Sequence, residues 1–172
     1  MLEQIKQPPR NHGITLIEVM IVVAIIAIIA AIASPSFRDM LARNQLNGFT
    51  QELQQDLQFA RSEAVAKNAT ITLSSIPTTS SIPPLPDPNQ PVVTGYGIFF
   101  GSTTIKTVTL PTPISLTAGN ADIEPLRGLV TGTGSWTISS TRTSAQLTVR
   151  INPIGRVSVC APTGAWGGHL SC

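Results

Sequence analysis

Charged and aromatic residues are scarce in this chain of 172 residues. Charged residues make up 12% of it and aromatic residues 5%, and the formal net charge is only +2. A composition so close to neutral gives no general reason to expect a nucleic-acid-binding protein or an acidic tail. The length fits one domain of ordinary size with a buried core, preceded by a membrane segment.

Histidine and cysteine are also rare, with two of each. His12 and His169 are far apart, and the carboxylates show no pairing, so the sequence contains no catalytic constellation and no metal-ligand spacing. We therefore expect no enzyme, no cofactor and no metal site. Cys160 and Cys172 lie close together at the C-terminus of a chain with an export-type apolar run, and for that reason we expect them to form a disulfide.

Acidic residues are missing from the last quarter of the chain. No Asp or Glu follows Glu124, whereas four arginines do. This asymmetry is the only electrostatic hint of a polyanionic partner. A solvated strand face with scattered arginines explains it equally well. The four residues are Arg127, Arg142, Arg150 and Arg156.

One long hydrophobic run is present, at residues 14–33. It contains about the twenty apolar residues that a helix needs to cross a hydrocarbon core. A single acid, Glu18, interrupts it, at a cost of about 2.5–3.5 kcal/mol on insertion scales unless a partner compensates the charge. No basic residue lies between Ile14 and Phe37, so the partner must come from elsewhere or from a new N-terminus.

A polar leader, residues 1–13, precedes this run and ends at Gly13. Its basic residues predict that it stays in the cytoplasm. A basic leader, a glycine and an apolar run with Glu18 in fifth place resemble type IV prepilins and type II secretion pseudopilins. The resemblance implies that a prepilin peptidase cuts between Gly13 and Ile14 and methylates the new amine. It also implies that Glu18 pairs with the N-terminal amine of a neighbouring subunit. The family usually has Phe where this chain has Ile14.

The main alternative is an ordinary secretory signal, because the residues from Ala31 to Ala33 look like a signal-peptidase site. The length of the apolar core, the presence of Glu18 and the helical pattern after Ala33 argue against it. A plain uncleaved anchor is a second alternative.

Residues 34–68 read as an amphipathic helix. Pro35 should kink or interrupt it where it leaves the bilayer. Beyond Pro35, apolar residues recur at spacings of three and four and predict packing against a sheet. These are Leu46, Phe49, Leu53, Leu57, Ala60 and Ala64. Residues 57–68, LQFARSEAVAKN, resemble the end of the long helix in the FimT, FimU and GspH group, and we interpret Arg61 and Glu63 there as a solvated helix face.

Residues 69–172 predict a β domain, because alternating β-branched residues replace the helical pattern. Six prolines at residues 76–91 exclude a central strand and indicate an exposed loop. One antiparallel sheet lying on the C-terminal half of the helix accommodates the rest. The expected strands are residues 69–75, 96–100, 104–110, 135–140, 144–151 and 156–160.

The stretch INPIGRVSVC, residues 151–160, resembles a turn of GspH and FimT proteins. In some FimT proteins this turn reads Gly-Arg-x-Arg and is implicated in binding DNA during natural transformation. Gly155 and Arg156 match, but Ser158 replaces the second arginine. The alternative is a structural turn with a solvated arginine. Other arginines could substitute if the strands bring them to the same edge, so the candidate DNA-binding residues are Arg142, Arg150 and Arg156.

Together these features predict an α+β type IV pilin fold, with a long N-terminal helix packed on a C-terminal antiparallel sheet. The resemblance implies a minor pilin of the FimT or FimU type, which helps to initiate or cap a type IV pilus and contributes to DNA uptake. A GspH-like minor pseudopilin of type II secretion is the alternative. Expected partners are the prepilin peptidase, the major pilin, other minor pilins and double-stranded DNA. The expected location is the bacterial inner membrane, with one span and a periplasmic C-terminal domain, and then the pilus or pseudopilus.

Overall fold

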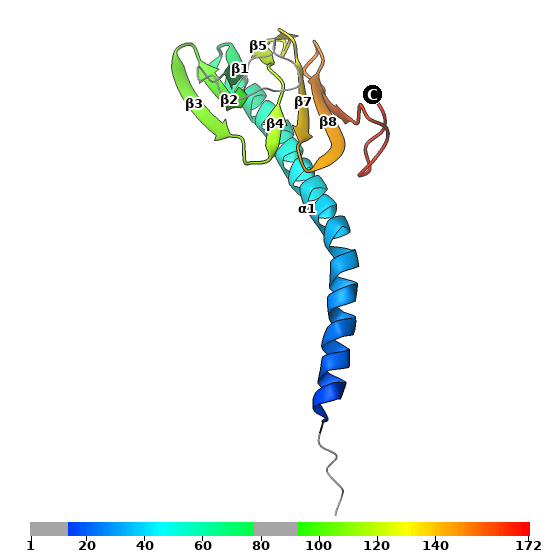
Figure 1. Ribbon diagram of the computed structural model, residues 1–172. Coiled ribbons are helices and arrows are strands. Elements are labelled where there is room, and N and C mark those ends of the chain that lie inside the picture. Colours follow the sequence, from blue (N-terminus) through cyan, green and yellow to red (C-terminus); the bar gives the residue numbers. More distant parts are fainter. Residues whose placement is uncertain (1–13, 78–92) are drawn as a thin grey trace, which may run out of the picture. The chain divides into compact units, whose positions relative to one another are not determined.

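The computed structural model describes residues 14–77 and 93–172, and the chain divides into two compact units, Met1–Phe37 and Arg38–Cys172 (Figure 1). The predicted leader, residues 1–13, lies outside the described residues. Most of the predicted proline-rich loop does so too. Its first two positions belong to a strand that continues through Pro77, so strand structure extends further than the prolines suggested.

One helix, α1 (Leu16–Lys67), supplies all of the described α structure. Thr15 caps its start, because the Glu18 amide donates a hydrogen bond of 3.3 Å to the Thr15 hydroxyl. A Thr followed three residues later by Glu is the capping-box pattern. The helix ends where Asn68 adopts a φ of 48° and the Ala69 amide donates to the Ala64 carbonyl at 3.2 Å. A left-handed residue followed by such a bond is a common helix stop.

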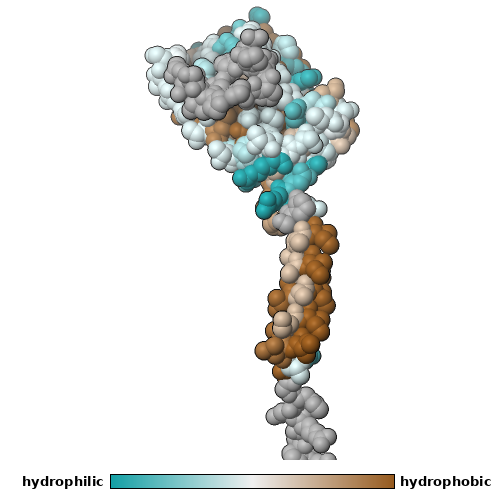
Figure 2. Space-filling model, in the orientation of Figure 1, coloured by the Kyte–Doolittle hydropathy of each residue, from teal (hydrophilic) through white to brown (hydrophobic). Residues whose placement is uncertain are grey.

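The part of α1 in the first unit exposes apolar side chains all round, which Figure 2 shows as a hydrophobic surface. Among the described residues, no single helix is both long enough and apolar enough to cross a membrane. The segments Leu16–Ile32 and Ser36–Lys67 meet these two criteria only when they are taken together as one span with a break between them. The bend expected at Pro35 falls near the boundary of the two units and stays a prediction.

The part of α1 in the second unit buries one stripe of side chains. All six residues of the predicted stripe belong to the hydrophobic core, and Leu46, Leu53 and Leu57 have no exposed surface. A fully buried leucine contributes roughly 1.5–3 kcal/mol relative to an exposed one. This stripe therefore holds the β strands against the helix.

The strands form two antiparallel sheets, which corrects the prediction of a single sheet. The first has the order β3 (Thr103–Thr109), β2 (Val93–Phe100), β1 (Ile71–Pro77), β5 (Asn120–Ile123) and β6 (Val130–Thr131). The second has the order β4 (Ile114–Leu116), β7 (Ser135–Ser140), β8 (Thr143–Ile151) and β9 (Val157–Cys160). The chain changes sheet because β4 pairs with β7 whereas the next strand, β5, pairs with β1.

Alternate residues of both sheets enter one core. In β7 the pattern is regular, so that Trp136 and Ile138 are buried while their neighbours are half-buried. Phe49 of α1 meets Tyr96 of β2 edge to face, with 5.9 Å between ring centroids. Both sheets therefore pack on the same helix, and the turns of the two sheets can lie close together.

Candidate functional site

Ile14 of the predicted cleavage site lies just before α1, and Glu18, the predicted assembly residue, lies in its first turn. From Ile14 to Ile32 the large apolar side chains are between 49% and 79% exposed. Glu18 lies in the first turn, and among the described residues it makes no ion pair. The positive end of the helix dipole favours an acid there, but by no more than about 1 kcal/mol when exposed. Gly13, on the other side of the expected cut, lies outside the described residues.

The Asn-Pro-x-Gly-Arg motif forms the turn between β8 and β9. The Arg156 amide donates to the Asn152 side-chain oxygen at 2.7 Å, and the Gly155 amide donates to the Asn152 carbonyl at 2.8 Å. Gly155 has a φ of 79°, a conformation that glycine adopts without steric cost. The Val130 amide donates to the Pro153 carbonyl at 2.9 Å, which joins this turn to β6. Asn152, Pro153 and Gly155 thus fix the position of Arg156 immediately before β9.

Two of the three candidate DNA-binding arginines lie at this end of the second sheet. Arg150 of β8 is the cross-strand partner of Ser158 of β9, and both are exposed. Directly opposed residues of an antiparallel pair have Cβ atoms about 4.5–5.5 Å apart. Arg150 therefore places a cation beside the position where the resembling motif has its second arginine. Arg156 is also exposed, two residues before Ser158.

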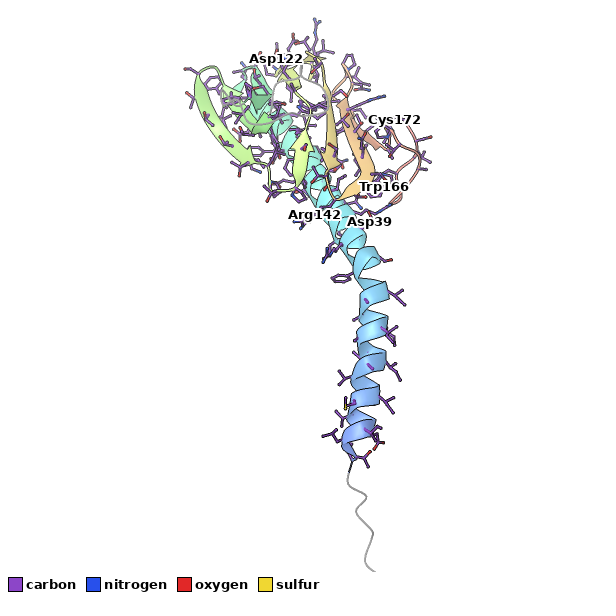
Figure 3. The ribbon with its side chains drawn as sticks, viewed as in Figure 1. Asp39, Asp122, Arg142, Trp166 and Cys172 are labelled. Carbon is purple, nitrogen blue, oxygen red and sulfur yellow. A yellow bond between two sulfur atoms is a disulfide. The ribbon has the colours of Figure 1, made fainter. Side chains whose placement is uncertain are left out.

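The third candidate, Arg142, is not part of this group. It lies in the turn between β7 and β8, at the opposite end of β8, roughly 26 Å away along a nine-residue strand. Figure 3 shows it near Asp39. Hydrogen bonds from Thr143 and Arg43 lower the pKa of Asp39, so Arg142 lies in a region where an acid is held ionised.

Arg61, which we interpreted as part of a solvated helix face, is exposed, and its guanidinium group also lies beside two turns. A Cβ built on Gly128 would lie 2.9 Å from Arg61 Nη2, and one built on Gly155 would lie 3.3 Å from Arg61 Cζ. Both glycines have positive φ. The contact joins residues that are distant in sequence and belong to different sheets, so no local pattern indicates it.

A hollow of about 410 Å³ lies where this helix face meets the β8–β9 turn. No acidic residue lines it, and neither of its two arginines forms an ion pair within the described part of the chain. Its lining residues are Leu57, Gln58, Arg61, Gly155, Arg156 and Val157. The structure thus adds Arg61 to the cationic residues that sequence analysis identified.

The C-terminal loop is closed by the predicted disulfide between Cys160 and Cys172, whose Cα atoms are 5.0 Å apart. Trp166, inside the loop, donates from Nε1 to the Gln146 carbonyl at 3.1 Å. The guanidinium carbon of Arg43 lies 5.5 Å from the centre of the Trp166 ring, within cation–π range. The loop (Figure 3) is therefore attached to both β8 and α1.

A buried ionic cluster ties α1 to the first sheet. Asp56 is only 6% exposed. It accepts hydrogen bonds from the Tyr96 hydroxyl at 2.8 Å and from Lys106 Nζ at 2.7 and 2.8 Å. Burial, and then the hydrogen bond to Asp56, raise the pKa of Tyr96. We interpret this cluster as structural, because its groups satisfy one another, with Lys106 at the edge of the core where its side chain is 39% exposed.

The described residues include no group of three His, Cys, Asp or Glu side chains that could hold a metal ion. What the arrangement offers chemically is an unpaired acid on an apolar helix and a small set of arginines around one turn. Neither feature is a constellation of nucleophile, base and oxyanion donors.

Comparison with known families gives two matches. Residues 8–34 match the prokaryotic N-terminal methylation motif, and residues 50–155, more than half of the chain, match the family of the type II transport protein GspH. No curated protein sequence matches significantly.

Among solved structures, the chain is similar to the type IV minor pilin FimU of Pseudomonas aeruginosa strain PAO1. The crystal form in space group P21 gives a TM-score of 0.50 at 18% identity, over 73% of this chain and 95% of that one. The form in space group P65 gives 0.47 at 18% identity, over 71% and 98%. At this identity the first likeness establishes the fold alone.

The methylation motif implies processing by prepilin peptidase and interaction with other pilins. Together with the hydrophobic N-terminal helix, it fits membrane anchoring and incorporation into a pilus or pseudopilus. The protein families concerned are structural rather than enzymatic. By its match over residues 50–155 and its N-terminal motif, this chain belongs to the GspH family of type IV pilin-like proteins and is a minor pilin or pseudopilin.

Proposed function

We propose that the chain is a minor type IV pilin of the FimT or FimU kind, which enters the filament at or near its tip and helps to start assembly. Residues 1–13 are a leader that prepilin peptidase removes after Gly13. Residues 14–33 cross the inner membrane once and then lie in the filament core, and residues 34–68 and 69–172 lie on the periplasmic side. The exposed apolar helix with one acid in its first turn carries the proposal.

Glu18 is the residue that links membrane and filament. An ionised carboxylate among lipid chains costs about 2.5–3.5 kcal/mol, and no described residue of the chain compensates it. Cleavage after Gly13 creates an amine on Ile14. The amine of a neighbouring subunit gives Glu18 its missing partner, so the pair forms only in the filament.

The test is Glu18→Ala in cells that assemble the filament. We expect the precursor to be cleaved and inserted as in the wild type, with a several-fold lower amount of the variant in sheared filaments. Thr15→Ala is the matched control, because it removes the helix cap and leaves the acid. Normal incorporation of Glu18→Ala, or an equal loss in Thr15→Ala, would remove Glu18 from the assembly role.

The alternative is a GspH-like minor pseudopilin of a type II secretion system, which the family match over residues 50–155 supports equally. Deletion of the gene separates the two. Loss of surface pili with normal secretion supports the pilus assignment, whereas loss of secretion with normal pili supports the alternative.

Binding of double-stranded DNA is a second candidate function. The observation in its favour is the pairing of Arg150 with Ser158, which puts a cation next to the position of the missing arginine, with Arg156 on the same exposed end. Few phosphate contacts are available, so binding should be weak. Log affinity should fall by roughly 0.9 per contact for each log unit of salt.

A titration of the full chain in neutral detergent with duplex DNA, at low and moderate salt, tests this. Arg156→Ala and Arg150→Ala should weaken binding, whereas Arg142→Ala, with the same charge change at the other end of β8, should leave it unchanged. Absence of binding at low salt, or equal effects of all three variants, would eliminate the DNA function and leave the filament function intact.

A further inference from the structure

We propose that the hollow between α1 and the β8–β9 turn is a binding site for a phosphoryl oxyanion, held between the guanidinium groups of Arg61 and Arg156. This site goes beyond the filament function and does not depend on DNA binding, because it requires only a single phosphate group. Its key residue, Arg61, lies on the helix outside the Gly-Arg turn.

Two cations line this hollow from separate elements. Arg61 belongs to α1, and Arg156 immediately precedes β9. Both line the same space of about 410 Å³. No carboxylate lines it. The ion pairs of the described residues involve other basic side chains, those of Arg43, Lys67 and Lys106. The positive charge at the hollow is therefore not neutralised by an ion pair within the described chain.

The backbone around the hollow leaves room for the Arg61 guanidinium group. Any side chain at Gly128 would begin 2.9 Å from Arg61 Nη2, and one at Gly155 would begin 2.8 Å from the Gly128 carbonyl oxygen. Both turns thus come close to Arg61 because both positions lack a Cβ. Arg61 is itself exposed, so its donors are accessible to a ligand.

The geometry favours phosphate over carboxylate. A guanidinium group offers a rigid fork of donors that matches two oxygens of an oxyanion. One fork engages both oxygens of a carboxylate, whereas a tetrahedral phosphate has further oxygens that a second fork can engage from another side. Gln58, also in the lining, adds an amide donor. Free phosphate and a phosphate within a polymer share this chemistry.

The experiment is an NMR titration of the ¹⁵N-labelled full chain in neutral detergent micelles, with the arginine Nε–H signals observed. Potassium phosphate is compared with potassium chloride at equal ionic strength, and a short DNA duplex forms a second arm. We expect saturable shifts for Arg61 and Arg156 with phosphate, little change with chloride, and no saturable shift for Arg142. If the polymer uses the same hollow, free phosphate should compete with the duplex.

Arg61→Gln should weaken phosphate binding by about tenfold or more, as read from the Arg156 signal, because one charge-assisted pair of hydrogen bonds is lost. Arg156→Gln, a change at an exposed position, should have a similar effect on the Arg61 signal and covers the case that Arg61→Gln unfolds. Arg142→Gln should bind like the wild type. Non-saturable shifts, or equal affinity in all variants, would overturn the site. A response to phosphate without binding of the duplex would support the phosphate site and exclude only DNA as its ligand.

Discussion

At the scale of single residues, Asp56 is the charged side chain that is buried in the described part of the fold. A buried carboxylate is tolerated when hydrogen bonds and an opposite charge satisfy it, and here Tyr96 and Lys106 do so. Tyr96 must stay neutral to donate its proton to this bond. Because burial and Asp56 raise the pKa of Tyr96 above its value in the unfolded chain, its contribution to stability is complete below about pH 10 and is lost as the pH rises toward the folded-state pKa.

Tyr96 is the only tyrosine of the chain, so its ionisation can be observed directly. We predict that the folded protein shows no tyrosinate absorbance at the pH near 10 where the chain unfolded in concentrated urea is half ionised. An ultraviolet pH titration of folded and unfolded samples measures this. Matching midpoints would contradict the buried hydrogen bond, and Tyr96→Phe gives the baseline without tyrosinate.

Gly155 is the residue on which the β8–β9 turn depends most. Gly155→Ala should lower the free energy of unfolding by more than about 1 kcal/mol, because its φ is positive and the new Cβ would lie 2.8 Å from the Gly128 carbonyl oxygen. Gly164→Ala is the control, since its φ is also positive but nothing lies within 4 Å. Denaturant unfolding should show the larger loss for Gly155→Ala, and equal losses would mean that the close packing of the turns has no energetic weight.

The sequence identified the residues of the β8–β9 turn itself, but not the helix residue that lies beside it. Gly155 and Arg156 are recognisable because they are adjacent in a motif with a turn glycine. Arg61 is not, since helical periodicity says only that it lies beside a buried stripe. Its proximity to Gly128 and Gly155 arises when two turns from separate sheets meet the same helix, and that meeting is a tertiary effect.

At the scale of elements, length determined which strands could be predicted. All six expected strands occur, with ends shifted by up to three residues. The three unexpected strands, β4, β5 and β6, have four residues or fewer, which is too short for an alternating pattern to emerge. They include β5, which lies inside the first sheet, and β4, which borders the second. The sequence pattern therefore could not indicate that the strands divide into two sheets.

The C-terminal loop is the element whose stability rests on one covalent bond. Cys172→Ser should raise amide hydrogen exchange in residues 161–171 and lower the free energy of unfolding by roughly 3 kcal/mol in the chain-entropy model, while the helical signal in circular dichroism stays unchanged. Ser171→Ala, which alters the same tail and leaves the disulfide, is the control. Unchanged exchange in Cys172→Ser would show that the Trp166 contacts hold the loop without the bond.

At the scale of the whole molecule, the two units differ in where their apolar side chains lie: the second unit buries them in a core, and the first exposes them. Every residue of the hydrophobic core lies within Arg38–Cys172, and that unit has buried apolar contacts from α1, both sheets and Ala161. The first unit has no core of its own among its described residues, and it exposes a continuous apolar surface. At roughly 25 cal/mol per Å² of apolar surface, such a helix requires lipid or neighbouring helices around it.

The pilin assignment meets this requirement, because a pilin helix is surrounded by lipid in the membrane and by other helices in the filament. Under the proposed cleavage, Glu18 would fit the second environment better than the first, because a cleaved neighbour would carry an amine and lipid chains do not. The central claim is thus that the chain is cut before Ile14 and then assembled.

The most direct test is mass spectrometry of the protein recovered from sheared filaments, with the N-terminal peptide sequenced. The account predicts that the protein is present in them, begins at Ile14 and carries a methyl group on its amine. A protein that begins at Met1 or at Ser34, or one that is absent from every filament fraction of cells that express it, would contradict the account.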